Sequence, residues 1–208
     1  FYFAGLGFNG SFSFCLGLWM TFMWNAFPNF NTYSSLFLIF LYLWLFIWNL
    51  FEFASFCTIF FSNATFGKIA AFGMCQLQTL VPLVMPAIES GGANDPANRI
   101  WGRRFLGMLA GCNVTWSLDV WYNLEMKLDG ATMSSLNMQI VTAKSVWSFG
   151  DGLLMNVIGI CFWFGLYVYS DQIIPSEFGV PRKWYFPFTR TFWMEEVFAP
   201  KRKEIPSG

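Results

Sequence analysis

Histidine is absent from this sequence of 208 residues, and charged residues make up only 12% of it. The lack of histidine excludes bis-histidine haem ligation and most zinc and copper sites. Only five cysteines are present, most of them in apolar runs, so no disulfide framework is predicted. There is also no G-x-x-x-x-G-K-[ST] phosphate-binding loop, because "SNATFGKI" at residues 62 to 69 lacks the first Gly and the hydroxyl residue after Lys68. We therefore expect no catalytic residue, metal or cofactor in this chain.

Apolar side chains dominate what is present. Hydrophobic residues make up 56% of the chain and aromatic residues 22%, which is more than a soluble domain can cover. We predict an all-α integral membrane protein that binds membrane lipids and no nucleic acid. A membrane-spanning helix needs about 20 largely apolar residues. Four segments meet that length: residues 1–27, 36–61, 65–88 and 146–170.

The region between the third and fourth segments is more polar. It holds two apolar patches, residues 105–110 and 114–124, which are too short to cross a bilayer. We predict a helical hairpin over about residues 99–128 that enters the membrane and leaves on the same side, as re-entrant segments do. A small ordered cap that lies wholly outside the bilayer is the alternative, and the sequence does not decide between them.

The distribution of basic residues predicts the orientation. Half of the twelve Lys and Arg residues lie from Arg182 onward, and an excess of basic residues marks the cytoplasmic side. The C-terminus is then cytoplasmic and the hairpin extracellular, although Arg99, Arg103 and Arg104 oppose this rule. Of three N-glycosylation sequons, the one at Asn113 is the acceptor that this orientation allows.

Several residues are candidates for contact with lipid. Glu52 is the one acidic residue in the most hydrophobic segment, and Asn49 and Ser55 lie three residues away on a partly shared helix face. An ionisable group at such a depth costs about 3 kcal/mol, so it marks either a lipid headgroup contact or a hydrogen bond between helices. Arg103 and Arg104 could attract anionic headgroups at the outer leaflet, or they could be a solvated pair.

The stretch "PSEFGVPRKWYFPF" at residues 175 to 188 is rich in proline and aromatic residues. Proline fixes φ and removes a backbone donor, so an extended path is predicted here. Trp184, Tyr185 and Phe186 could hold this path at the level of the lipid headgroups. We name residues 175–208 the exit strap; as an alternative, they merely end a helix.

The exit strap resembles the end of the transmembrane domain in the A subfamily of ABC transporters. Residues 58–74 and 103–125 are similar to that family's turn between consecutive spans and to its extracellular helical hairpin. The residues that carry the resemblance at the exit are Pro175, Glu177, Phe178, Gly179, Pro181, Trp184, Tyr185, Phe186 and Pro187.

The resemblance implies an architecture larger than this chain. Residues 1–174 would be a transmembrane domain that holds helices three to six of an exporter half, followed by the exit strap. The first residue is not Met, and we expect two helices and an extracellular domain before it. A nucleotide-binding domain that binds ATP and Mg would follow Gly208.

The implied function is that of one transmembrane half of an ATP-driven transporter of phospholipids or sterols, in the plasma membrane or an endomembrane. Its partners would be a second transmembrane half and nucleotide-binding domains, and the whole transporter would be an ATPase-coupled translocase. The alternative is a non-catalytic structural or assembly subunit of a large membrane complex. A third reading, a proton path or channel through Glu52, is disfavoured because no second buried ionisable group lies near it in the sequence.

Overall fold

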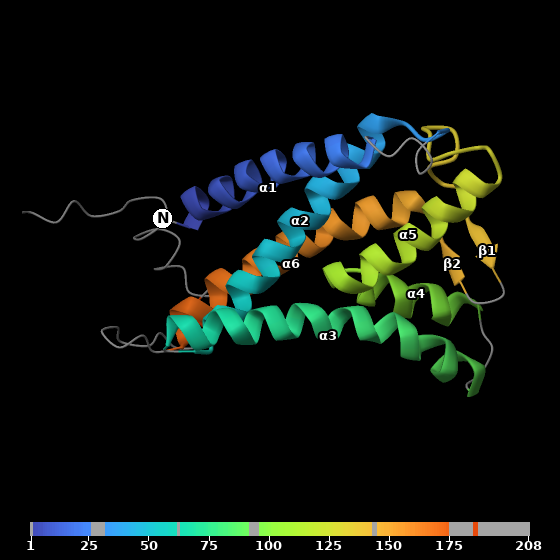
Figure 1. The fold of residues 1–208 in the computed structure, drawn as a ribbon. Coiled ribbons are helices and arrows are strands. Elements are labelled where there is room, and N and C mark those ends of the chain that lie inside the picture. Colours follow the sequence, from blue (N-terminus) through green and yellow to red (C-terminus); the bar gives the residue numbers. More distant parts are fainter. Residues whose placement is uncertain are drawn as a thin grey trace, which may run out of the picture.

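The computed structural model describes residues 2–25, 32–61, 63–91, 96–142, 145–174 and 185–186, and these form a helical bundle (Figure 1). The predicted predominance of helix is confirmed. The helices and strands of this part of the chain are α1 (Tyr2–Asn25), α2 (Leu36–Thr58), α3 (Ala64–Gly91), α4 (Pro96–Leu106), α5 (Ala110–Met126), β1 (Ile140–Thr142), β2 (Ser145–Trp147) and α6 (Phe149–Ile173).

Two of the helices, α2 and α6, are long and apolar enough to cross a membrane. The predicted set of four spanning helices is therefore supported only for these two. Helices do form within the other two predicted segments, but α1 carries several glycines together with Asn9, and α3 carries Lys68 and two glutamines. A membrane crossing by α1 and α3 stays a prediction.

The last helix begins later than the sequence indicates. We predicted it from Val146, but Ser145–Trp147 is a strand that pairs antiparallel with Ile140–Thr142. Ser148 then caps α6, because its hydroxyl accepts a hydrogen bond from the backbone N–H of Asp151 (3.0 Å) while the Asp151 carboxylate accepts one from the N–H of Ser148 (3.3 Å). This capping box fixes the start of α6 at Phe149.

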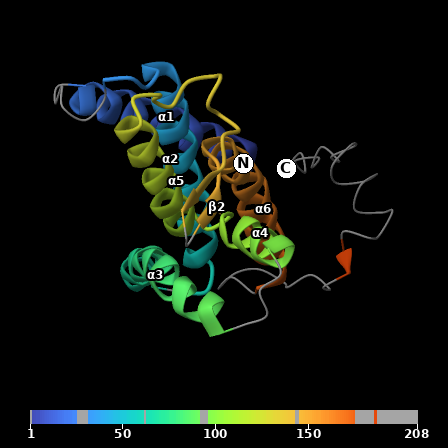
Figure 2. The same ribbon diagram turned by 90° about the vertical axis from the view of Figure 1, so that its right-hand side faces the viewer.

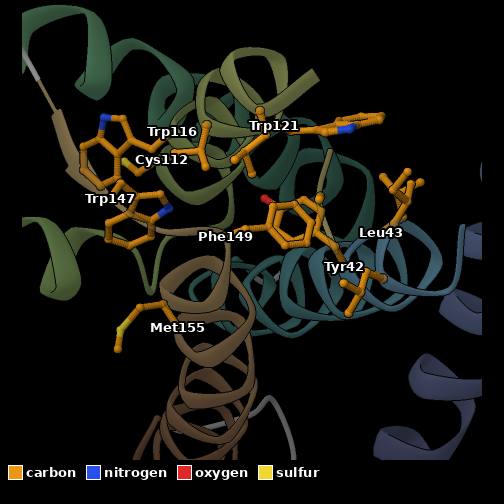
Figure 3. Packing of buried hydrophobic residues seen from close by; sticks show 13 residues of the cluster. Tyr42, Leu43, Cys112, Trp116, Trp121, Trp147, Phe149 and Met155 are labelled. Atoms are coloured by element: carbon orange, nitrogen blue, oxygen red, sulfur yellow. The ribbon is translucent and has the colours of Figure 1, made fainter. Parts of the chain in front are cut away.

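Helix α5 lies at the centre of the fold, where it packs against α2, α3 and α6. Figures 1 and 2 show α1 and α3 on opposite sides of this central group. Figure 3 shows the core, in which Tyr42 of α2 faces Phe149 of α6 and Trp116 of α5 lies beside Trp147. The fully buried apolar side chains include Leu38, Cys112, Val120, Leu124, Trp147 and Phe149.

Helix α1 packs on α2 through its glycines. The indole ring of Trp48 packs directly on Gly10, where an added Cβ would stand 3.0 Å from the ring. The backbone of Trp44 packs in the same way on Gly17, where an added Cβ would stand 3.1 Å from it. The indole N–H of Trp44 also donates to the Gly10 carbonyl (3.1 Å). These small residues therefore join two helices of the same chain, the close approach that small residues permit in membranes.

The outward faces of α1 and α3 carry large apolar side chains. Phe3 is 81% exposed and Leu83 is 70% exposed. An apolar surface of this kind on a soluble protein would mark a binding or aggregation site, whereas in a bilayer it is the ordinary lipid-facing surface.

Two glycines provide a matched test of the packing between α3 and α5. A Cβ at Gly111 would stand 2.6 Å from the Cβ of Gln78 and 2.9 Å from the backbone nitrogen of Thr79, whereas nothing lies within 4 Å of a Cβ at Gly73. Gly111→Ala must push the two backbones apart, and we expect it to lower the free energy of unfolding by about 1–3 kcal/mol. Gly73→Ala should be neutral or stabilise α3 by up to about 1 kcal/mol. Thermal unfolding of both variants in detergent checks this, and equal midpoints would contradict the packing.

Candidate functional site

The connection between α4 and α5, residues 107 to 109, places backbone carbonyls deep among the helices. The amide of Asn113 donates to the Gly107 carbonyl (2.9 Å). The Met108 carbonyl accepts two hydrogen bonds, one from the amide of Asn49 (3.2 Å) and one from the indole of Trp163 (3.0 Å). Side chains of α2, α5 and α6 thus satisfy the carbonyls that this turn leaves without helical partners.

The position of this turn along α2 and α6 is near their middle. Asn49 lies 13 residues into the 23-residue helix α2, which is about 20 Å of a total of about 34 Å at 1.5 Å per residue. Trp163 lies about 21 Å into α6 by the same measure. The other end of α5 lies beside the start of α2, where Glu125 accepts hydrogen bonds from the N–H groups of Tyr33 (3.2 Å) and Ser34 (2.9 Å).

Asn113 is the centre of a buried polar cluster. Besides its bond to Gly107, its amide donates to the Gly152 carbonyl of α6 (2.9 Å). Its side-chain oxygen accepts hydrogen bonds from the hydroxyls of Tyr42 (3.0 Å) and Ser117 (3.1 Å). Asn113 itself is 0% exposed. One side chain therefore ties α5 to α2, to α6 and to the turn that precedes it.

The predicted glycosylation of Asn113 finds no support in this arrangement. A glycan is attached at the side-chain nitrogen, and that nitrogen is enclosed between the carbonyls of Gly107 and Gly152. The folded chain has no space for a sugar there. The sequon arises because a buried helix places a threonine, Thr115, two residues after Asn113, and the Thr115 hydroxyl donates within the helix to the Gly111 carbonyl.

Asn156 of α6 extends the cluster, and the sequence analysis did not single it out. Its side-chain oxygen accepts a hydrogen bond from the Asn49 amide (3.0 Å), and both residues are fully buried. Close packing keeps this pair together, because a Cβ at Gly159 would stand 2.7 Å from the Asn49 side-chain oxygen. Asn156 could have been identified in the sequence as a lone asparagine in an apolar spanning segment.

Glu52 and Asn49 lie on α2 but face different partners. The Glu52 carboxylate accepts hydrogen bonds from the Asn9 amide of α1 and from the Trp48 indole, both at 3.1 Å. Asn49 faces the α4–α5 turn instead. Ser55 is half-buried, and its backbone carbonyl accepts a hydrogen bond from the Thr58 hydroxyl (2.7 Å). The structure thus does not bring the three predicted residues into one site.

The two arginines of α4 also lie in different surroundings. Arg103 is 3% exposed, and its guanidinium lies 5.8 Å from the ring centroid of Trp116. Arg104 forms an ion pair with Asp151 (3.0 Å) and lies over the ring of Trp101. Only Arg104 is near the surface, and its charge is already matched by the carboxylate that caps α6.

Most of the exit strap lies outside the described residues. Pro175, Glu177, Phe178, Gly179, Pro181, Trp184 and Pro187 belong to that part of the chain. Tyr185 and Phe186 are described, and the ring of Phe186 stacks on Tyr169 of α6 with the centroids 5.8 Å apart and the planes 16° from parallel. Phe186 is 9% exposed, so it packs on protein, whereas Tyr185 is 39% exposed.

The described residues offer binding groups rather than reactive ones. In the parts of the chain that the structure covers, no group of three Cys, Asp or Glu side chains could hold a metal ion. The Cys112 thiol donates to the Gln78 carbonyl (3.2 Å) and is 0% exposed, so it is not placed to act as a nucleophile. What the arrangement can do is hold α2, α5 and α6 together.

Comparison with known proteins gives one short match to report. No family model matches the chain. The chain is similar to "ABC transporter A family member 2" of Dictyostelium discoideum, with 44% identity over 39 residues, or 19% of this chain. The match covers 2% of the length of that protein. It hints at a relation to ABC transporters and is too short to show a subfamily.

The buried cluster yields a test with a control on the same helix. Asn113→Ala leaves the carbonyls of Gly107 and Gly152 without their donor, so we expect the free energy of unfolding to fall by about 1–3 kcal/mol. Asn123→Ala removes only bonds within its own helix, to the carbonyl (2.7 Å) and the carboxylate (3.4 Å) of Asp119, and should change the free energy of unfolding by less than about 0.5 kcal/mol. Thermal unfolding in detergent measures both. Equal losses would show that the cluster does not hold the helices together.

Proposed function

We propose that this chain forms part of the transmembrane region of an ATP-driven lipid transporter related to the A subfamily of ABC transporters. The observation that carries the proposal is the similarity to "ABC transporter A family member 2", joined to two helices that can cross a membrane. ATP and Mg would bind outside this chain. The C-terminus would be cytoplasmic, and phospholipids or sterols are the proposed cargo.

The proposed role of α4 and α5 is that of a re-entrant hairpin. Their connection lies about 20 Å along α2, so it lies within the hydrocarbon layer when α2 crosses the bilayer. Irregular backbone is tolerated at that depth only where protein covers it and satisfies its polar groups. The bonds from Asn49, Asn113 and Trp163 meet that requirement, which favours the re-entrant hairpin over an external cap.

The proposed coupling element is the contact between Phe186 and Tyr169. Tyr169 lies about one turn before the end of α6, and Phe186 returns to it from 17 positions further along the chain. A fully extended strap would lead away from α6 without contacting it. Because Phe186 instead stacks on α6, force applied to the strap from a nucleotide-binding domain would act directly on the last helix.

Depth measurements test the re-entrant hairpin. Phe105 of α4 is 69% exposed and lies near the turn, and Met133 in the loop after α5 is 66% exposed, which makes the two a matched pair. Spin labels are attached at Phe105→Cys and at Met133→Cys after the native cysteines are replaced. The label at position 105 should be accessible to oxygen dissolved in the lipid, whereas the label at position 133 should be accessible to a water-soluble relaxation agent. Equal access of both to the water-soluble agent would support the external cap.

ATP-driven lipid transport is testable in the full-length protein that contains this chain. In liposomes, fluorescent phospholipid or sterol should move between leaflets when ATP is added. Phe186→Ala should lower that rate about two- to tenfold, the effect of losing one aromatic pair, while Tyr185→Ala changes it less. Absence of ATP-dependent movement in the wild type, with the complex intact, would favour a structural or assembly subunit.

A further inference from the structure

Glu52 is a carboxyl group that α1 and α2 enclose. It is 1% exposed. Both donors that reach it, the Asn9 amide and the Trp48 indole, bind the same oxygen, Oε1. No described residue donates a hydrogen bond to the second oxygen, Oε2. The environment therefore holds one oxygen as an acceptor and leaves the other for a proton.

Among the described residues, no cation forms an ion pair with Glu52. The ionisable groups on the neighbouring helices are neutral or acidic near it. On α6, Tyr167 lies within electrostatic range of both Glu52 and Asp171. On α1, the hydroxyl of Tyr2 donates to Asp171. On α3, Lys68 is exposed, and Cys75 is near Cys57 rather than Glu52.

Asp171, Tyr2 and Tyr167 meet at the end of the bundle where α1 begins and α6 ends. Asp171 is exposed near the end of α6 and accepts the bond from Tyr2, whose hydroxyl also accepts one from the Gln172 amide (2.6 Å). The ring of Tyr2 meets that of Tyr167 edge to face, with the centroids 5.9 Å apart. Glu52 and Tyr167 each lie six residues, or about 9 Å, from the ends of α2 and α6.

We propose that Glu52 is a proton-binding site, loaded from the end of the bundle where α1 begins and α6 ends. The ligand is a hydrated proton, which bonds to the carboxylate oxygen Oε2 and leaves one water molecule behind. The sequence seemed to lack a second ionisable group near Glu52. The fold supplies Tyr2, which is 50 residues away in the sequence, and Tyr167 and Asp171, which are more than a hundred residues away.

Proton binding links this site to the contact between α1 and α2. A neutral carboxyl group is compatible with burial, whereas a buried carboxylate without a cation is strongly penalised. Lower pH therefore favours α1 packed on α2, and deprotonation at higher pH favours their separation. A bulkier cation such as a lipid amine is disfavoured, because Glu52 is buried and α1 packs closely on α2 through Gly10 and Trp48.

Dicyclohexylcarbodiimide, an apolar reagent that attacks protonated carboxyl groups, tests the proposal in the full-length protein in nanodiscs at neutral pH. Mass spectrometry should find the adduct on Glu52 and not on Glu125, a carboxylate held by several donors at the opposite end of the bundle. Labelling should fall as the pH rises and be absent in Glu52→Gln. An unlabelled Glu52 in the wild type, or labelling that is independent of pH, would overturn the proposal.

Infrared spectroscopy provides a second, reagent-free measurement. Wild-type protein should show a carboxylic acid carbonyl band that Glu52→Gln lacks and Glu125→Gln retains. Tyr167→Phe keeps the ring and removes the hydroxyl, so it should keep the band but slow its decay after a jump to high pH. An unchanged decay would contradict entry past Tyr167, and a band that survives in Glu52→Gln would contradict the site itself. Neither measurement needs ATP or transport, so each stands apart from the transporter proposal.

Discussion

The carbonyls of the α4–α5 turn impose the constraint on which the rest of this fold depends. A chain that reverses direction among apolar helices must find hydrogen-bond donors for its free backbone groups, since neither lipid nor water supplies them there. The donors come from three helices that are distant in sequence, through Asn49, Asn113 and Trp163. The turn can occupy this position only when α2, α5 and α6 are correctly placed against one another. The hairpin and the long helices therefore depend on each other for their packing.

The lengths of the apolar runs and patches were sufficient to predict most of the helices. The same signals could not show that α5 would be the most enclosed of them, because its sequence mixes charged residues with apolar ones. They also missed the strand at Ser145–Trp147, since a three-residue strand adjoining a long apolar helix has no period of its own. The capping pair of Ser148 and Asp151 was the local signal that marks the true start of α6.

The candidate site was harder to predict than the fold. In the sequence, Asn113 was predicted only as a glycosylation site. In the fold, its side chain forms hydrogen bonds to α2, to α6 and to the α4–α5 turn. Glu52 and Asn49 share part of a helix face by spacing, yet α2 is flanked by α1 on one side and by α5 and α6 on the other, so the two side chains enter different contacts. Which neighbour a polar side chain meets depends on helix packing, and that information is not contained in any single segment.

Asp151 takes part in two separate interactions. It completes the capping box of α6, and it is the ion-pair partner of Arg104 on α4. Its Oδ1 accepts hydrogen bonds from Arg104, whereas its Oδ2 accepts them from Ser148, so the two oxygens of one carboxylate link α4 to the first turn of α6. A tilt of α4 would therefore be transmitted to the start of α6 through this one side chain.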